Sequence, residues 1–390
     1  MAQAPRASAG SYELILRLPP GGLSAGEEMQ IEFRLLDTRP PQGPRPVLFA
    51  KVRGVVDMPS MPSMPRFDEI AHREGVPGDY GVHPTFPHGG EYRLSLTLLP
   101  PGEQPPTMSA RNEGPLTFEF TLEVADAAEP NPRAPRVKPV PFMLTVSTVP
   151  SLPVAGQPTE IDLGVRRENM LITEADGSFS VGDAPVEEFD VAHEKIMHLF
   201  LVRQDLGAFA HEHPEPAGPG AFRLRHVFPS AGTYRVFADV APKNAGSQIL
   251  AGEIKVTGPP PEPFRAGAAF ASDPGTKTIV EGLEIEWSVP RPVPLKRTFT
   301  LEARLRRVDG GPMALEPWLG SLGHLMMIPL DGQTMVHCHP DEREPIVPKG
   351  TTVTIPFLVR LPKAGLYRGW GQFQRGGRVL TTDFLIRAGE

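Results

Sequence analysis

Alternating apolar and polar residues form the dominant pattern along the chain, and this pattern predicts β-strands. The segment Tyr234–Val240 places apolar side chains at every second position, as a strand with one buried face requires. Tyr12–Leu18 and Met29–Leu36 predict two further strands, joined by the glycine-containing turn 21–26. The regular elements are therefore expected to be short strands separated by turns.

The same plan occurs three times along the chain. Each block opens with two strands and a turn, and each has a late Gly-x-Tyr-Arg sequence, with the tyrosine at Tyr92, Tyr234 or Tyr367. A tyrosine at the corner of a sandwich often bonds its hydroxyl to nearby backbone, so the motif is expected to be structural. The sequence thus predicts an all-β chain of three consecutive immunoglobulin-like β-sandwich domains.

Two proline-rich stretches, Asp126–Pro141 and Thr257–Pro263, separate the three blocks. Successive prolines favour the extended polyproline II conformation, so both stretches are predicted to be stiff linkers. The predicted domains are residues 10–126, 140–257 and 264–390.

Composition excludes several other classes of protein. The 390 residues include 48 Pro and 39 Gly, too many for a fold of long helices because proline lacks a backbone N–H. With 40% hydrophobic residues the chain is too apolar for a disordered polymer. The net charge is −7 and there is no dense basic run, so no nucleic-acid partner is expected. No apolar stretch approaches the 18 or so residues of a transmembrane helix.

The N-terminal residues predict a location outside the cytoplasm. Ala2-Gln3-Ala4 has the small-x-small form of a signal-peptide cleavage site. We therefore expect a periplasmic or secreted protein whose signal peptide has been removed. Cys338 is the single cysteine, so an intrachain disulfide is excluded.

A duplicated histidine pattern is the most informative chemical feature. Residues 198–214 and 324–340 both fit His-x12-His-x-His-Pro without a gap. The histidines of these two frames are His198, His211, His213, His324, His337 and His339. Turn sequences beginning at Asp205 and Asp331 divide each frame into two strands, which predicts two β-hairpins.

Each predicted hairpin brings three imidazoles together. Strand alternation puts both histidines of His-x-His on one face, and cross-strand pairing can place the first histidine opposite them. Three converging imidazoles suit copper, or alternatively zinc, with one position open for another ligand. Pro214 and Pro340 are expected to end the return strands, which predicts sites at a solvent-accessible sandwich rim.

The residues around the histidines refine this hypothesis. Alternation directs Cys338 to the face opposite the histidines, whereas Met326 and Met335 share faces with His324 and His337. Their thioethers could join a site and would favour Cu(I). The alternative is that the duplicated histidines are hydrogen-bonded architecture. His193 and His226 have no counterpart in the third block and are expected to be solvated.

The first block carries a different candidate. Met58, Met61 and Met64 are spaced by three and each is followed by proline. In polyproline II, with three residues per turn, their thioethers would project from one side. His83 and His88 lie downstream, and a Met/His mixture suits copper better than zinc. The alternative is that the methionines fill a gap beneath a loop.

These motifs resemble known bacterial domains. The Met-Pro repeat and the strand Pro87-His-Gly-Gly-Glu-Tyr92-Arg-Leu resemble YtkA-like and FixH-like domains. The second and third blocks resemble the His-Leu…His-x-His-Pro…Gly-x-Tyr-Arg modules of secreted bacterial proteins. The resemblance implies small extracytoplasmic sandwiches found in heavy-metal contexts, often with copper handling or cytochrome oxidase assembly.

Two functions from different classes follow from the sequence. The first is an extracytoplasmic metal-binding protein that binds, delivers or confers tolerance to copper, in contact with a metal ion and a protein partner. The alternative is a structural or scaffolding multi-sandwich protein that mediates protein–protein contacts in a larger extracytoplasmic assembly. An enzyme is not expected, because the sequence has no Gly-x-Ser-x-Gly elbow, His-Glu-x-x-His helix or phosphate-binding loop.

Overall fold

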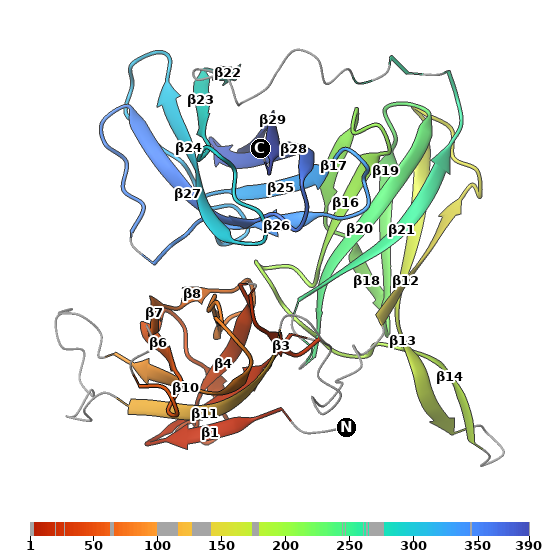
Figure 1. Ribbon diagram of the computed structural model, residues 1–390. Helices are drawn as coiled ribbons and strands as arrows, with labels where there is room; N and C mark the ends of the chain where they lie inside the picture. The colour runs from red at the N-terminus through yellow and green to blue at the C-terminus, as the bar shows by residue number, and fades with distance from the viewer. Residues whose placement is uncertain are drawn as a thin grey trace. The chain divides into compact units, whose positions relative to one another are not determined.

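The regular structure of the chain consists of β-strands. The computed structural model describes residues 4–19, 21–26, 28–62, 66–99, 116–126, 142–173, 179–243, 245, 247–259, 261–262, 264, 277–343 and 345–389. Within these residues, strands β1 to β29 form two sheets in each of the three blocks (Figure 1). The prediction of three consecutive immunoglobulin-like sandwiches is confirmed. Most of the first predicted linker, 127–141, lies outside the described residues.

The first block folds into two sheets around one apolar core. One sheet has the order β1 (Arg6–Ala9), β2 (Tyr12–Arg17), β4 (Ile31–Asp37), β9 (Asp79–Val82) and β8 (His72–Arg73), with β5 (Arg45–Pro46) beside β4. The other has the order β3 (Leu23–Ser24), β11 (Leu116–Ala125), β10 (Gly90–Leu98), β6 (Val52–Asp57) and β7 (Phe67–Ile70). Alternate side chains such as Leu94 and Leu96 enter the core, which is why the sequence alternates.

The second block repeats this architecture. One sheet has the order β12 (Phe142–Val149), β13 (Pro158–Thr173), β19 (Ala221–Val227) and β18 (Glu215–Gly218), with β14 (Phe179–Pro185) beside β13. The other has the order β15 (Phe189–Asp190), β20 (Gly232–Pro242), β16 (Met197–Arg203) and β17 (Phe209–Glu212), with β21 (Gln248–Val256) beside β20. Strands β16 and β17 form the predicted hairpin.

The third block has two four-stranded sheets. One has the order β22 (Lys277–Val280), β23 (Leu283–Ser288), β24 (Thr298–Arg307) and β27 (Thr352–Arg360). The other has the order β26 (Val336–Cys338), β25 (His324–Pro329), β28 (Gly365–Arg375) and β29 (Arg378–Ala388). Strands β25 and β26 form the second predicted hairpin.

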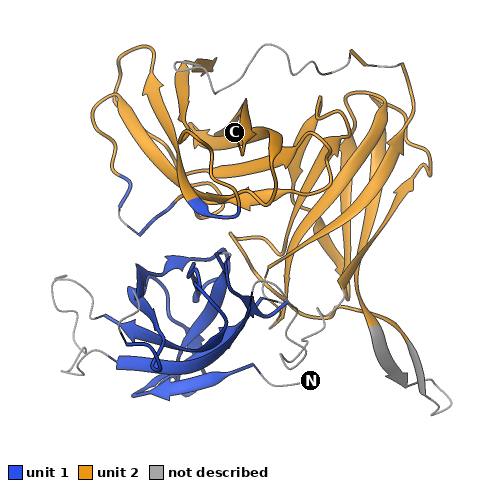
Figure 2. Cartoon of the chain, viewed as in Figure 1, with its two compact units in different colours: residues 1–139, 296–298, 341–346 blue, residues 140–295, 299–340, 347–390 orange. Residues whose placement is uncertain are grey.

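The chain forms two compact units. Unit 1 contains residues 1–139, 296–298 and 341–346, and unit 2 contains residues 140–295, 299–340 and 347–390 (Figure 2). The second and third sandwiches therefore belong to one unit. The predicted boundaries of three separate domains stay a prediction. In the described part of the chain, no helix is long and apolar enough to cross a membrane.

The three Gly-x-Tyr-Arg sequences form three equivalent corners. The hydroxyls of Tyr92, Tyr234 and Tyr367 each donate a hydrogen bond to the carbonyl oxygen four residues earlier, over 2.9, 3.0 and 2.9 Å. All three rings are buried. The preceding glycines have φ angles of 137°, 138° and 133°, which side chains disfavour. The structural role predicted for the motif is confirmed.

Strands β16 and β25 are buried on both faces, and this property joins the two sandwiches of unit 2. Alternate residues of β16, such as Leu199 and Leu201, enter the core of the second sandwich. The other face contributes to a separate apolar group, here called the inter-sandwich cluster. Its buried members are Phe200, Val202, Leu206, Phe237, Met326, Ile328, Met335 and Trp370. Phe209 packs against the cluster, with its ring stacked on Trp370 at a centroid distance of 4.7 Å.

Candidate metal centre

The first histidine triad lies beside the inter-sandwich cluster. His198 is in β16, on the same face as Phe200, and His211 is in β17, where it is paired opposite Phe200. His213 follows the end of β17. Nδ1 of His198 lies 3.2 Å from Nε2 of His211 and 3.3 Å from Nε2 of His213. The structure thus brings together the three histidines of the first frame.

Hydrogen bonds on the far side of two rings determine which nitrogen carries the proton. Nε2 of His198 lies 3.1 Å from the carbonyl oxygen of Ala192, and Nδ1 of His211 lies 2.8 Å from Oε1 of Gln372. Both oxygens can only accept, so these two ring nitrogens donate. The nitrogens that face each other, Nδ1 of His198 and Nε2 of His211, therefore carry lone pairs.

The spacing of these nitrogens fits a metal ion. Two facing lone pairs cannot hydrogen-bond, so a direct bond does not explain the 3.2 Å between His198 and His211. A metal that binds imidazole nitrogens at about 2.0–2.1 Å in tetrahedral geometry separates its ligand atoms by roughly 3.3 Å. The first triad could therefore hold a metal ion without large rearrangement.

The second triad repeats this arrangement in the third sandwich. Nε2 of His324 donates to the carbonyl oxygen of Trp318 over 3.0 Å, and Nδ1 of His337 donates to Oδ2 of Asp239 over 2.8 Å. The remaining nitrogens are Nδ1 of His324, Nε2 of His337 and Nε2 of His339, all buried and without a hydrogen-bond partner. They lie within 4.8 Å of one another, so the second triad could also hold a metal ion.

The two sandwiches exchange the partners that orient the triads. Gln372 of β28 bonds to His211 of the second sandwich, and Asp239 of β20 bonds to His337 of the third. In the sheets, Asp239 is paired opposite His198 and Gln372 opposite His324. A histidine that binds a metal through one ring nitrogen commonly donates the N–H of the other to a carboxylate or carbonyl oxygen, which fixes the orientation of the ring. Each triad is thus completed by a residue of the other sandwich.

Burial keeps five of the triad imidazoles neutral. It lowers the pKa of His198 to about 4 and that of His213 to about 3, and neighbouring imidazoles add to the effect. The pKa values of His211, His324 and His339 also lie well below the ordinary value for the same reason. Neutral imidazole is the form that binds metal, so these five histidines are in the ligand state at neutral pH.

The two triads are adjacent. The ring centroid of His198 lies 5.6 Å from that of His337, and the centroid of His211 lies 6.0 Å from that of His324. Trp318 covers both triads, with its ring centroid 5.3 Å from His211 and 4.9 Å from His324. Strands β17 and β25, which contain His211 and His324, lie near each other in unit 2 (Figure 1). The six predicted histidines therefore form one cluster.

The structure corrects three predictions about the histidines. The triads lie between two sandwiches and not at a solvent-accessible rim, because the faces of β16 and β25 that carry the histidines pack together. His193 is not solvated, since its ring stacks on His339 at 3.6 Å and its Nε2 is buried. His226 is not solvated either: its side chain is 10% exposed and Nδ1 lies 3.1 Å from Oε1 of Glu212.

The neighbouring sulfur-containing residues Met326, Met335 and Cys338 are all buried. Met326 and Met335 share the triad faces as expected, but both are buried in the inter-sandwich cluster. Cys338 is buried, and burial raises the pKa of its thiol to about 12. It is paired opposite Leu325. Among the described residues, the groups of three or more His, Cys, Asp or Glu side chains that could hold a metal ion are the two histidine triads.

The methionines and histidines of the candidate copper site in the first block have different surroundings. Met58 is buried in the core, whereas Met61 is 46% exposed, so their thioethers do not project from one side. The reason is a turn, in which the Met61 N–H donates to the Met58 carbonyl, in place of polyproline II. Met64 lies outside the described residues. His83 stacks on His72, and Nδ1 of His88 bonds to the carbonyl of Gly89.

The fold and the site together define a class of protein: a chain of immunoglobulin-like β-sandwiches with two histidine triads that could each hold a metal ion. The family described as "Domain of unknown function (DUF8832)" matches residues 151–256 and 277–390, and the chain belongs to this family. The two matches correspond to the second and third sandwiches, which carry the triads. No curated protein matches the chain.

Solved structures align with the chain at low similarity. Invasin, a bacterial integrin-binding protein, is 12% identical with a TM-score of 0.19, over 96% of this chain and 60% of that chain. The Escherichia coli adhesin FdeC is 11% identical with a TM-score of 0.18, over 99% and 100%. The D1–D4 ectodomain fragment of ICAM-5 is 10% identical with a TM-score of 0.18, over 96% and 77%. The chain thus spans less than two thirds of the invasin structure, and TM-scores this low support no inference.

Proposed function

We propose that the protein binds two metal ions, one at each histidine triad between its second and third sandwiches. The observation that carries this proposal is the convergence of Nδ1 of His324, Nε2 of His337 and Nε2 of His339, which are buried and without a partner. Leaving a buried polar atom unpaired costs about 1–3 kcal/mol. Three such atoms around one point favour a cation that accepts all three lone pairs.

Copper is the metal that we propose, with zinc as its competitor. A set of imidazole ligands suits copper, zinc, iron and nickel, and Cu(II) has the highest affinity of the divalent ions for such sites. Met326 and Met335 lie in the adjacent inter-sandwich cluster and give the surroundings a soft, apolar character. The resemblance of the first block to YtkA-like and FixH-like domains also favours copper.

We further propose that the protein stores, delivers or sequesters this metal outside the cytoplasm and performs no catalysis. The triads are buried between packed strands, and His198 and His324 have almost no exposed surface. Burial of this kind suits retention of an ion more than turnover of a substrate. Release to a protein partner would then require the two sandwiches to loosen.

Metal counting tests the proposal. The purified full chain is loaded with Cu(II) or Zn(II), passed over a desalting column and analysed for bound metal. We expect two ions per chain, one after His213→Gln or His339→Gln, and none after both substitutions. Glutamine keeps the side chain polar, and these two histidines are only half-buried, so the fold should persist.

His88→Gln is the matched control, because His88 lies in the first block and bonds to backbone. This variant should still bind two ions, and circular dichroism should show the β fold in every variant. The proposal is wrong if the wild type retains no stoichiometric metal, or if the double variant binds as much metal as the wild type.

A scaffolding role is the second candidate, and the inter-sandwich cluster favours it. The stacking of Phe209 on Trp370 and the burial of Phe200 and Met326 join two sandwiches into one platform that could carry protein partners. The bonds from His211 and His337 to the opposite sandwich would then serve to hold the platform together. On this hypothesis, histidine substitution loosens unit 2 in metal-free protein and changes no metal content.

A further inference from the structure

The two triads differ in the residue that orients the middle histidine. Asp239 and Gln372 hold corresponding positions, each five residues after the corner tyrosine of its sandwich, Tyr234 or Tyr367. Both accept a hydrogen bond from Nδ1 of a histidine across the interface, over the same distance of 2.8 Å. One partner is therefore a carboxylate and the other is a neutral amide.

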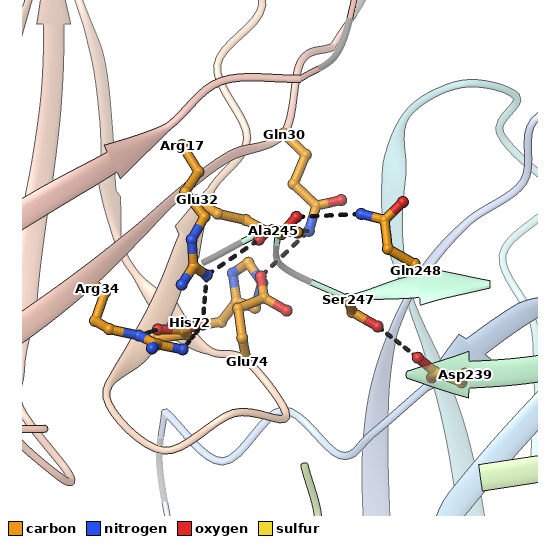
Figure 3. Close-up of polar contacts among 11 residues, drawn as sticks. Arg17, Gln30, Glu32, Arg34, His72, Glu74, Asp239, Ala245, Ser247 and Gln248 are labelled. Carbon is orange, nitrogen blue, oxygen red and sulfur yellow. Dashed lines mark hydrogen bonds and ion pairs between the residues drawn. The ribbon is translucent and has the colours of Figure 1, made fainter. Parts of the chain in front are cut away.

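The carboxylate of Asp239 is only 14% exposed and has few partners that could balance its charge. Among the described side chains, its hydrogen-bond partners are His337 and the hydroxyl of Ser247, and the latter bond is drawn in Figure 3. Among the described residues, no lysine or arginine forms an ion pair with this carboxylate. A largely buried carboxylate, here with a side chain that is 14% exposed, is costly when it lacks a cationic partner. A metal ion on the opposite nitrogen of the His337 ring would supply the missing positive charge.

The carboxylate of Asp239 also affects how strongly His337 can bind a metal. A carboxylate that accepts the Nδ1–H of an imidazole increases the basicity of Nε2, whereas an amide oxygen does so less. His337 should therefore donate more strongly to a metal than His211 does. In both triads the first histidine presents Nδ1 and the other two present Nε2, so this difference acts on closely matched sites.

A second difference adds an imidazole to the same triad. The ring of His193 stacks on His339 at a centroid distance of 3.6 Å, and its Nε2 is buried without a partner. The corresponding position before His324 is occupied by Leu319, an apolar residue. An additional nitrogen donor thus lies next to the second triad.

We infer that the triad His324, His337 and His339 is the tighter of the two metal sites and fills first, with Asp239 as its positioning residue. This inference rests on the proposed function, since it concerns the relative affinity of the same two sites. The ion at the first triad is then the more readily exchanged one. The pair of triads would act as one retentive and one labile site.

Single-site variants test the inference directly. His213→Gln leaves only the second triad intact and His339→Gln leaves only the first, so each variant should bind one Cu(II) ion. Competition with a chelator of known affinity should give His213→Gln a dissociation constant that is lower than that of His339→Gln by roughly 10- to 100-fold. Equal constants, or the reverse order, overturn the inference.

Asp239→Asn identifies the cause of the difference. In the His213→Gln background this near-isosteric change should raise the dissociation constant roughly 10- to 100-fold and shift the Cu(II) electron paramagnetic resonance spectrum. The matched change Gln372→Glu in the His339→Gln background should tighten the first site. An unchanged affinity and spectrum in Asp239→Asn refutes the role of Asp239. Absence of metal from all variants and from the wild type instead refutes the proposed function.

Discussion

Nδ1 of His211 bonds to Oε1 of Gln372 over 2.8 Å, although the two residues belong to different sandwiches. His337 and Asp239 make the reciprocal contact in the opposite direction. Each triad is therefore oriented only when the two sandwiches are packed together. Metal binding and the stability of this interface are expected to be thermodynamically linked.

Metal should stabilise unit 2 against unfolding. A ligand that binds only the folded state adds about 2.7 kcal/mol when its free concentration is 100 times the dissociation constant. The three tryptophans, Trp287, Trp318 and Trp370, all belong to unit 2, so their fluorescence reports on this unit. We expect Zn(II) to raise the urea midpoint of the tryptophan transition, and EDTA to reverse the change.

The variant that lacks both His213 and His339 provides the control for this linkage. Its urea midpoint should be insensitive to Zn(II) and to EDTA. A metal-induced shift of equal size in this variant would show that the ion acts elsewhere on the chain.

The inter-sandwich cluster should contribute as much to the free energy of unfolding of unit 2 as an ordinary protein core does. Phe200 is fully buried, and its ring stacks on His211 at a centroid distance of 4.4 Å. Phe200→Ala should lower the free energy of unfolding of unit 2 by about 3–5 kcal/mol, because it leaves a cavity. Leu152→Ala, at a residue 54% exposed in the same unit, should change it by less than about 0.5 kcal/mol. Tryptophan-detected urea unfolding compares the two, and similar small losses would contradict a shared core.

Local patterns predicted much of this fold and part of the site. The alternation of apolar and polar residues and the repeated tyrosine motif reflect contacts within one sandwich. Short segments of sequence are enough to predict such contacts. The equal spacing of the two histidine frames likewise predicted two triads. The packing of β16 against β25 could not be predicted, because an apolar strand such as 198–202 indicates two covered faces without naming what covers them.

The residues that were missed lie outside the histidine frames. Asp239 and Gln372 bond to the frames only across the interface. A signal for them existed, since both occur five residues after the repeated tyrosine. At Met58 the sequence prediction was wrong. The Met-Pro repeat predicted polyproline II, but the structure forms a turn at this position.

Each corner tyrosine should stabilise its sandwich through the hydrogen bond from its hydroxyl to the backbone. Tyr234→Phe removes the bond from the hydroxyl to the carbonyl of Ser230, together with its contact to the Ser230 hydroxyl, but keeps the buried ring. The expected loss is about 0.5–1.5 kcal/mol in the free energy of unfolding, measured by tryptophan fluorescence in urea. Tyr367→Phe makes the same change in the other sandwich and should lose a similar amount. A loss in neither variant would contradict a structural role for the motif.

The stability of unit 1 should depend on pH through Glu32. Burial, together with the nearby charge of Glu74, raises the pKa of Glu32 to about 7, and both carboxylates approach the amide of Gln30 (Figure 3). The folded state therefore favours the protonated carboxyl. Its contribution is fully present below the ordinary pKa of 4.5 and is lost as pH rises through about 7. The loss amounts to up to about 3 kcal/mol at pH 8. Hydrogen exchange of β2 and β4 should accordingly show less protection at pH 8 than at pH 5, after correction for the intrinsic rate, whereas Glu32→Gln should show no such difference. Equal pH dependence in both proteins would assign the effect to another group.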